Sequence, residues 1–298
     1  MRPVNPPADT VVRAVTQDGA FRVIVTLTTA TVKGAVTAQD VSGSTAARLG
    51  ELVTGAVLVR EAMAPDRRVQ LILQGSNKGG TLVADSHPDG SNRGIVNLGG
   101  RREVVLAPGS LLQVLRTLPA GMHQGVVEVP PGGGVSDALM AYMQESEQVA
   151  SVIAASSLID EDPEGRSGGY FVQLLPEAER GLLMVMTERL ASFPSLASML
   201  KDPALTAQSL LAELLHGMPF TLTAETGVHF GCHCSRERLL ASLGTLPQGD
   251  IAEMIQAGEP LHIRCDGCAK EYVLAVDDLA ALIQPPDMFG GAPPRGSA

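Results

Sequence analysis

Apolar and polar positions in the first part of the chain follow both strand and helix periods. The segment Phe21–Val32 is rich in β-branched residues and RVQLILQG, ending at Gly75, has the same character, so both predict strands. Between them, STAARLGELVTGAVLVREAM places apolar residues at helical spacing. This pattern predicts a helix capped by Ser42 or Ser44.

The segment that follows, up to residue 176, predicts more strands than helices. A polar, glycine-rich stretch to Gly94 predicts a hairpin or loop. PPGGGVSDALMAYMQESEQVASVI predicts a turn and then a helix capped by Ser136, and SGGYFVQLLP predicts a strand over Ser167–Pro176. Three further strands are expected near Gly94–Leu98, Val104–Leu106 and Gly125–Val129. Because strands and helices do not alternate regularly, we expect an α+β core domain with an antiparallel sheet over residues 1–176, frayed at its proline-rich start, residues 1–10.

The character of the chain changes after this domain. From Glu177 to Thr226 the pattern predicts a helical linker with three short amphipathic helices, broken at Pro194 and Pro203. Several methionines lie in it. They are interpreted either as ordinary core filling or as an adaptable apolar surface, because methionine repacks easily against varied partners.

Composition and charge narrow the classes of function. The chain has 298 residues, 45% of them apolar, and a net charge of −10, which disfavours nucleic acid and anionic membranes as partners. No apolar run approaches the ~20 residues that span a bilayer. The first residues, MRPVNPPADTVV, lack the apolar core of a signal peptide. We therefore expect a cytoplasmic protein whose cysteines are in a reducing compartment.

All four cysteines fall in one C-terminal segment. Cys232 and Cys234 form Cys-x-Cys, thirty residues intervene, and Cys265 and Cys268 form Cys-x-x-Cys. In a reducing compartment such a cluster is typical of a metal site or a redox switch, and four thiolates suit tetrahedral Zn²⁺. SRERLLASLGTL and QGDIAEMIQAG predict helices between the two pairs. The segment has few large apolar residues, so we expect the metal to supply most of its stability.

Two interpretations of the cluster remain open from spacing alone. A permanently structural zinc site is one. The other is a reversible switch, because a disulfide between Cys232 and Cys234 closes a small, strained ring that is easily reduced again. Since four cysteines already complete a tetrahedron, the nearby histidines are predicted to be bystanders. They are His229, His233 and His262.

The same segment is a poor candidate for binding nucleic acid. Between His229 and Tyr272 six acidic residues outnumber four basic ones, and four zinc-bound thiolates add further negative charge.

The chain resembles the redox-regulated 33 kDa chaperonin family, also called heat shock protein 33. CHCSRER and CDGCAKEYVLAVDDLAAL are similar to the two cysteine signatures of this family. Upstream, QESEQVASVIA, SGGYFVQLLP, LGELVTGAVLV and NRGIV also fit, in the family's order. The similarity spans nearly the whole chain.

The resemblance implies a stress-activated holdase that binds unfolding client proteins without ATP. It implies a zinc-bound, reduced monomer of low activity. Oxidation would form the disulfides Cys232–Cys234 and Cys265–Cys268, release zinc, unfold the zinc domain and linker, and give an active dimer. The implied organisation is a core over 1–176, a metastable linker over 177–226, a zinc-binding switch domain over 227–285 and a disordered tail over 286–298.

Two other classes of function compete with this one. Cys265-x-x-Cys268 alone would suit a thiol–disulfide oxidoreductase, and a permanent zinc site would suit an adaptor protein. The sequence contains no Gly-x-Ser-x-Gly, His-Glu-x-x-His or P-loop motif, so we expect neither a hydrolase nor an ATPase, and no enzyme.

Overall fold

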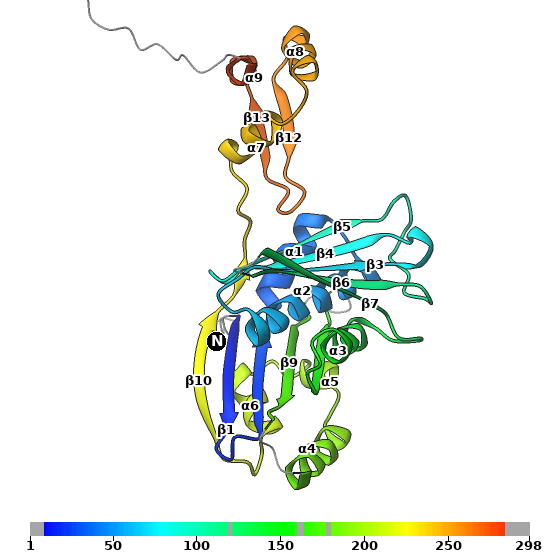
Figure 1. Ribbon diagram of the computed structural model, residues 1–298, viewed down its shortest axis with the longest axis vertical. Coiled ribbons are helices and arrows are strands. Elements are labelled where there is room, and N and C mark those ends of the chain that lie inside the picture. Colours follow the sequence, from blue (N-terminus) through cyan, green and yellow to red (C-terminus); the bar gives the residue numbers. More distant parts are fainter. Residues whose placement is uncertain (1–8, 119–120, 160–163, 177–179, 284–298) are drawn as a thin grey trace, which may run out of the picture. The chain divides into compact units, whose positions relative to one another are not determined.

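The computed structural model describes residues 9–118, 121–159, 164–176 and 180–283 (Figure 1). Contacts divide the chain into two units, Met1–Cys232 and His233–Ala298, which we describe separately. The expected disordered tail over 286–298 lies outside the described residues, as do the first eight residues of the stretch that was expected to be frayed.

A five-stranded antiparallel sheet forms one layer of the first unit. Its strands, in spatial order, are β10 (Phe220–Gly227), β1 (Thr10–Thr16), β2 (Phe21–Leu27), β9 (Ser167–Leu174) and β8 (Ser151–Ser157). The outermost strand at one side, β10, comes from the end of the segment predicted to be a linker. The core sheet is therefore completed by residues far along the chain.

A six-stranded sheet forms the second layer. Its strands, in spatial order, are β11 (His229–Phe230), β5 (Ser91–Asn97), β4 (Thr81–Ser86), β3 (Val69–Gln74), β6 (Leu111–Leu118) and β7 (Gly121–Glu128). The short β11 runs parallel to β5, and the other neighbours are antiparallel. A single 3-10 turn, η1 (Ser76–Lys78), follows β3. The glycine-rich stretch up to Gly94 thus contains most of a hairpin made by β4 and β5.

Helix α2 (Gly43–Met63) lies between the two sheets and is buried over most of its length (Figure 1). Together with α1 (Thr29–Gln39) and α3 (Val135–Glu145), it packs into the main apolar core. A helix buried on nearly all sides carries few charged groups, and the middle of α2, residues 52–59, contains none. The α+β class and the antiparallel sheet expected from the sequence are confirmed.

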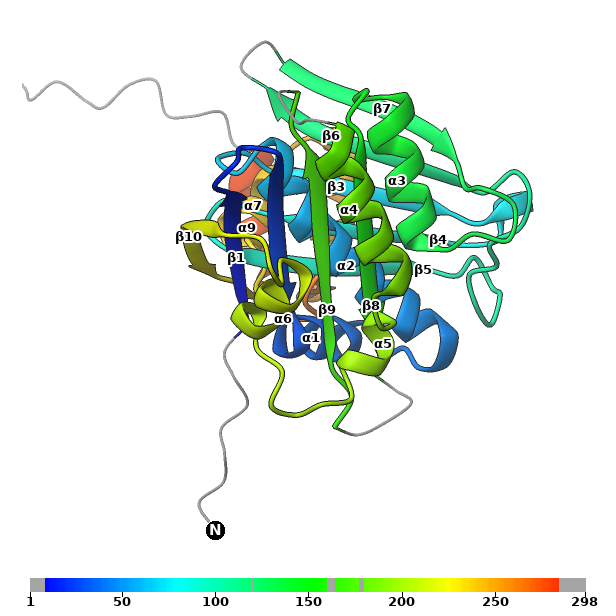
Figure 2. The same cartoon turned by 90° about the horizontal axis from the view of Figure 1, so that it is seen from below.

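Three helices cover the outer face of the five-stranded sheet. They are α4 (Arg180–Ser192), α5 (Leu196–Met199) and α6 (Ala207–Leu214) (Figure 2). Their apolar side chains, Met186, Leu196 and Leu211 among them, bury against β1, β2 and β9 in a second core. Thr206 caps α6, accepting a hydrogen bond from Ser209 N at 3.0 Å. The prediction of three helices broken at two prolines is confirmed.

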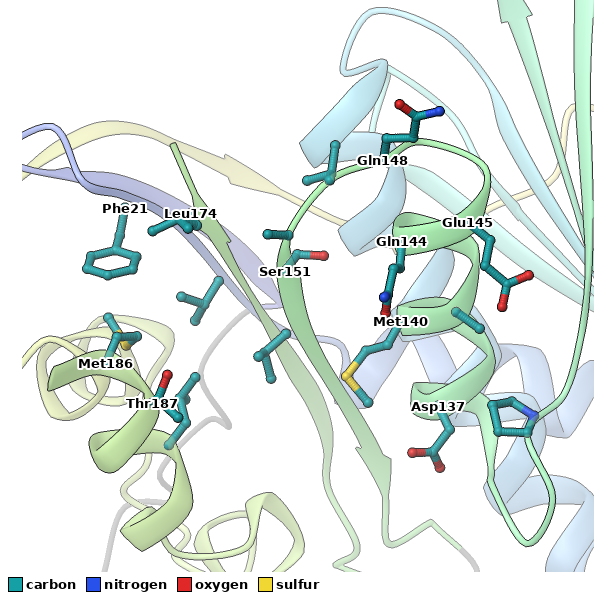
Figure 3. Close-up of a pocket in the computed structure, with 17 residues that line it drawn as sticks. Phe21, Asp137, Met140, Gln144, Glu145, Gln148, Ser151, Leu174, Met186 and Thr187 are labelled. Atoms are coloured by element: carbon teal, nitrogen blue, oxygen red, sulfur yellow. The ribbon is translucent and has the colours of Figure 1, made fainter. Parts of the chain in front are cut away.

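A groove of about 950 Å³ opens beside these helices, between α3 and α4 (Figure 3). Met140 and Gln144 of α3 line one side and Met186 of α4 the other, while Phe21 and Leu174 lie on its sheet side. The first unit therefore presents a largely apolar surface beside α4.

The second unit is small. It consists of α7 (Arg236–Leu243), α8 (Gln248–Ala257), β12 (Leu261–Arg264), β13 (Glu271–Leu274) and α9 (Val276–Ile283). β12 and β13 form an antiparallel hairpin. Among its described residues, the large apolar side chains that are nearly fully buried are Ile251, Leu274 and Leu279. The two helices predicted between the cysteine pairs, α7 and α8, are confirmed.

Several predicted elements are wrong at their ends. The strand predicted over Phe21–Val32 stops at Leu27, and α1 begins at Thr29. No strand forms at Val104–Leu106. The helix predicted to reach Ile153 ends at Glu145, and its last residues form β8 instead.

The predicted N-cap position is confirmed for α2 and wrong for α3. Ser42 stands at the N-cap position of α2 without a capping side-chain hydrogen bond. The N-cap of α3 is Gly134, and the hydroxyl of Ser136 instead accepts a hydrogen bond from Ala155 N at 3.0 Å. Ser136 therefore ties α3 to the edge strand β8. None of the described helices has the length and apolar character needed to cross a membrane.

Candidate metal centre

The four cysteines predicted as ligands come together in the structure. Their Sγ atoms all lie within 4.8 Å of one another, and each side chain is half-buried. The cluster found among the described residues includes none of the three nearby histidines. Two sulfurs from different pairs, Cys234 Sγ and Cys268 Sγ, are 3.4 Å apart, and no disulfide joins the four cysteines.

The backbone places the Cys-x-x-Cys pair in a tight turn between β12 and β13. Cys265 N donates to Lys270 O and Ala269 N donates to Cys265 O, each at 2.9 Å. Ala269 has a φ of 60°, a left-handed conformation that closes this turn. The positive φ of this turn falls on Ala269 and not on Gly267.

The first cysteine of the other pair is fixed by the six-stranded sheet. Cys232 lies one residue beyond the end of β11. The pairing of β11 with β5 continues through the intervening residue, by a hydrogen bond of 2.9 Å from Gly231 N to Asn92 O. A Cβ at Gly231 would come within 2.9 Å of Ser91 Cβ. Glycine is needed here for this close approach of two strands, not because of its backbone angles.

Two side chains donate hydrogen bonds to the sulfurs of the Cys-x-Cys pair. Arg93 Nη1 lies 3.2 Å from Cys232 Sγ, and the Tyr272 hydroxyl lies 3.1 Å from Cys234 Sγ. The hydrogen bond with the Cys234 sulfur raises the pKa of Tyr272 above its usual value. Neither donor was predicted from the sequence. Arg93 was visible only as part of the NRGIV motif, and Tyr272 only as part of the second cysteine signature.

Arg93 is held by a buried carboxylate. Its Nε donates to Asp85 Oδ2 at 2.8 Å, and the Asp85 side chain is fully buried. Burial disfavours the charged guanidinium, but the hydrogen bonds and charges of Asp85 and Cys232 outweigh it and raise the pKa of Arg93 above its ordinary value. Arg93 therefore stays positively charged beside the sulfur.

The donor set fits a soft, tetrahedral metal ion. Four sulfurs bound at ~2.3 Å to one ion lie about 3.8 Å apart, a spacing that sulfurs within 4.8 Å of one another reach with small adjustments. Four thiolates are a typical ligand set for structural Zn²⁺. The cluster can therefore hold one metal ion, and the residues that would bind it are Cys232, Cys234, Cys265 and Cys268.

An α+β unit with two largely antiparallel sheets, followed along the chain by four clustered thiols, defines the class of protein. The family model described as Hsp33 protein matches residues 9–275. The chain belongs to the Hsp33 family.

Similar proteins carry consistent names. A 33 kDa chaperonin of Syntrophotalea carbinolica is 30% identical over 289 residues, covering 92% of this chain and 99% of the relative. A 33 kDa chaperonin of Clostridium perfringens is 28% identical, covering 93% of this chain and 92% of the relative.

The fold is shared with a solved structure. The crystal structure of the 33 kDa chaperonin, a heat shock protein 33 homologue, from Thermotoga maritima has a TM-score of 0.79 at 21% identity. The aligned region covers 92% of this chain and 97% of the Thermotoga maritima chain. Membership of this family supports a chaperone function, which was the leading expectation from the sequence.

Proposed function

We propose that this protein is an ATP-independent holdase for unfolding proteins, gated by the oxidation of a four-cysteine zinc site. The observation that supports it most is the cluster of four half-buried sulfurs within 4.8 Å in a chain of the Hsp33 family. In the reduced state the cysteines Cys232, Cys234, Cys265 and Cys268 hold one Zn²⁺. The ion keeps their sulfurs deprotonated and cross-links the two pairs.

Oxidation removes these ligands in two steps for each pair. One thiolate attacks peroxide and becomes a sulfenic acid, with release of hydroxide. The neighbouring thiol then attacks the sulfenic sulfur and forms a disulfide, with release of water. The proposed pairs, Cys232–Cys234 and Cys265–Cys268, are those implied by the family resemblance and need the least chain movement. The short distance between Cys234 and Cys268 shows that proximity alone does not select them.

The loss of the metal then destabilises the elements that depend on it. The second unit has a thin apolar core, and α4–α6 are short helices laid on the outer face of a sheet. When they detach, the apolar side chains of β1, β2 and β9 become available to clients and to a second copy of the chain. Such a protein holds clients by burying exposed apolar surface and needs no nucleotide. We propose a reducing, cytoplasmic location, in which the zinc-bound form is the resting state.

The test pairs metal release with holding activity. Purified, reduced protein is warmed with hydrogen peroxide, zinc is quantified with a chromogenic chelator, and suppression of thermal aggregation of an unrelated enzyme is measured before and after oxidation. The proposal expects about one zinc per chain to leave and suppression to appear only after oxidation.

A Cys268→Ser variant is the matched comparison. It is expected to bind zinc weakly and to hold clients after milder treatment. If zinc stays bound, or leaves without a gain in holding activity, the site is structural and an adaptor role replaces the switch. An insulin-reduction assay addresses the oxidoreductase alternative.

A further inference from the structure

Asp85, Arg93 and Cys232 form a continuous chain of polar contacts within the first unit. Asp85 lies on β4 and Arg93 on β5, directly opposite each other in the antiparallel register. The guanidinium of Arg93 bridges from the Asp85 carboxylate at 2.8 Å to the Cys232 sulfur at 3.2 Å. The sulfur of one proposed ligand is thus connected to the interior of the six-stranded sheet.

The carboxylate end of this chain is rigid. Asp85 is fully buried and accepts further hydrogen bonds from Arg68 Nη2 at 2.6 Å and Gln70 Nε2 at 3.0 Å. A buried carboxylate with several donors keeps one orientation, because each lost hydrogen bond would leave a charge unpaired in the interior. Arg93 is therefore aimed at the sulfur by groups that play no part in metal binding.

The sulfur end is positioned by backbone pairing. β11 runs parallel to β5 and pairs Phe230 with Asn92, so Cys232 emerges from the sheet beside Arg93. The ring of Phe230 packs against Gly34 of α1, where an added Cβ would meet the ring at 2.5 Å. The contact between Arg93 and Cys232 follows from the register of the sheet and does not depend on a chance side-chain conformation.

A fixed positive donor changes what the sulfur can do. A charge-assisted hydrogen bond draws electron density from the thiolate and stabilises it. Groups that hydrogen-bond to metal ligands orient them, and their loss typically weakens metal binding 10–100-fold. A donor that engages a lone pair of the sulfur also makes it less nucleophilic toward an oxidant. Both effects keep a metal-bound sulfur in its reduced state.

We infer that Arg93 is a positioning residue that restrains the oxidation of Cys232 and so sets how much oxidant is needed to empty the metal site. This inference rests on the proposed function, because it concerns the regulation of the same four-cysteine site. It assigns part of that regulation to the core sheet, outside the segment that contains the cysteines.

The experiment compares Arg93→Gln with Arg68→Gln in the full, zinc-loaded chain. Both variants remove one arginine from Asp85, but only Arg93 also donates to Cys232. We measure the rate of zinc release by peroxide, the release to a competing chelator without peroxide, and the cysteine at which dimedone first traps a sulfenic acid. Thermal unfolding of each variant checks that the core remains folded.

Arg93→Gln is expected to release zinc to peroxide severalfold faster, because Cys232 Sγ loses the hydrogen-bond donor that holds it. It is also expected to weaken zinc binding at least tenfold and to increase early trapping at Cys232. Arg93→Lys, which keeps the charge but lacks the forked guanidinium, should fall between Arg93→Gln and the unaltered protein. Arg68→Gln leaves Arg93 and Gln70 hydrogen-bonded to Asp85, so it should change zinc release far less than Arg93→Gln does.

Two results overturn the inference: Arg93→Gln releasing zinc no faster than the unaltered chain, or Arg68→Gln accelerating release equally, which would assign the effect to Asp85. These readouts are independent of holding activity. If oxidised, unaltered protein fails to hold clients while Arg93→Gln still accelerates release, the proposed function fails and this inference stands. The trapping experiment gives an answer for Cys232 whatever the zinc content of the protein.

Discussion

Removing the metal under reducing conditions should unfold the second unit and leave the first intact. Among the described residues of the second unit, three large apolar side chains are nearly fully buried. They are Ile251, Leu274 and Leu279, at 2%, 0% and 1% exposure. Each contributes about 1.5–3 kcal/mol by burial, so together they give about 5–9 kcal/mol before any cost of ordering the chain. A structural zinc supplies an apparent ~10–16 kcal/mol, more than these side chains combined. Without the metal, an ordering cost of about 1–2 kcal/mol per residue exceeds what these side chains contribute.

Hydrogen exchange measured by mass spectrometry reports each unit separately in the full chain. After a chelator strips the metal in the presence of reductant, peptides from α8, β12 and β13 should exchange within seconds. Peptides from β2 and β9, in the five-stranded sheet, should keep their protection. Adding zinc back should restore protection in the second unit, which controls for irreversible damage. Persistent protection of α8 and of the β12–β13 hairpin in metal-free, reduced protein would refute the reasoning.

Three further outcomes are expected. Leu211→Ala, at a fully buried position of α6, should cost about 2–5 kcal/mol of unfolding free energy and lower the temperature at which the oxidised protein holds clients. Leu222→Ala, at a site 51% exposed, should change stability by under about 0.5 kcal/mol in the same denaturant titration. Gly231→Ala should push β11 away from β5 and weaken zinc binding in a chelator competition. Gly227→Ala, whose added Cβ meets nothing within 4 Å, should leave zinc binding unchanged. Burial raises the pKa of Glu51 to about 7, so between pH 5 and 7 the folded protein holds a proton that the unfolded chain releases. The free energy of unfolding should therefore fall as the pH rises from 5 to 7. Glu51→Gln should abolish that fall in thermal melts.

The cysteine cluster and the helices α4, α5 and α6 could be predicted because the sequence patterns that indicate them are local. Two close pairs of cysteines indicate a metal site from spacing alone, and Pro194 and Pro203 mark where helices cannot continue. The helix α2 was equally clear, since its apolar residues follow one period for several turns.

The strands that were missed depend on partners far away in the sequence. Residues Ser151–Ser157 continue a helical pattern, yet they form β8 because β9 pairs with them along their whole length. The segment between α3 and β8 turns at Gln148, whose φ of 56° is left-handed. A glutamine side chain does not predict such a turn. The Arg93 contact was hidden for the same reason, since only the register of β5 with β11 brings it beside Cys232.

The spacing of the four cysteines also determines what a metal ion does to the entropy of the chain. One ion bound to all four cysteines would join Cys234 to Cys265 and close a loop with thirty residues between them. Closing a loop of that length removes ~4 kcal/mol of chain entropy from the unfolded state. Disulfides within each pair close loops of only one or two intervening residues and leave the long loop open. Exchanging the ion for two local disulfides keeps every sulfur bonded, yet it frees the thirty residues between the pairs to explore conformations that the metal forbids.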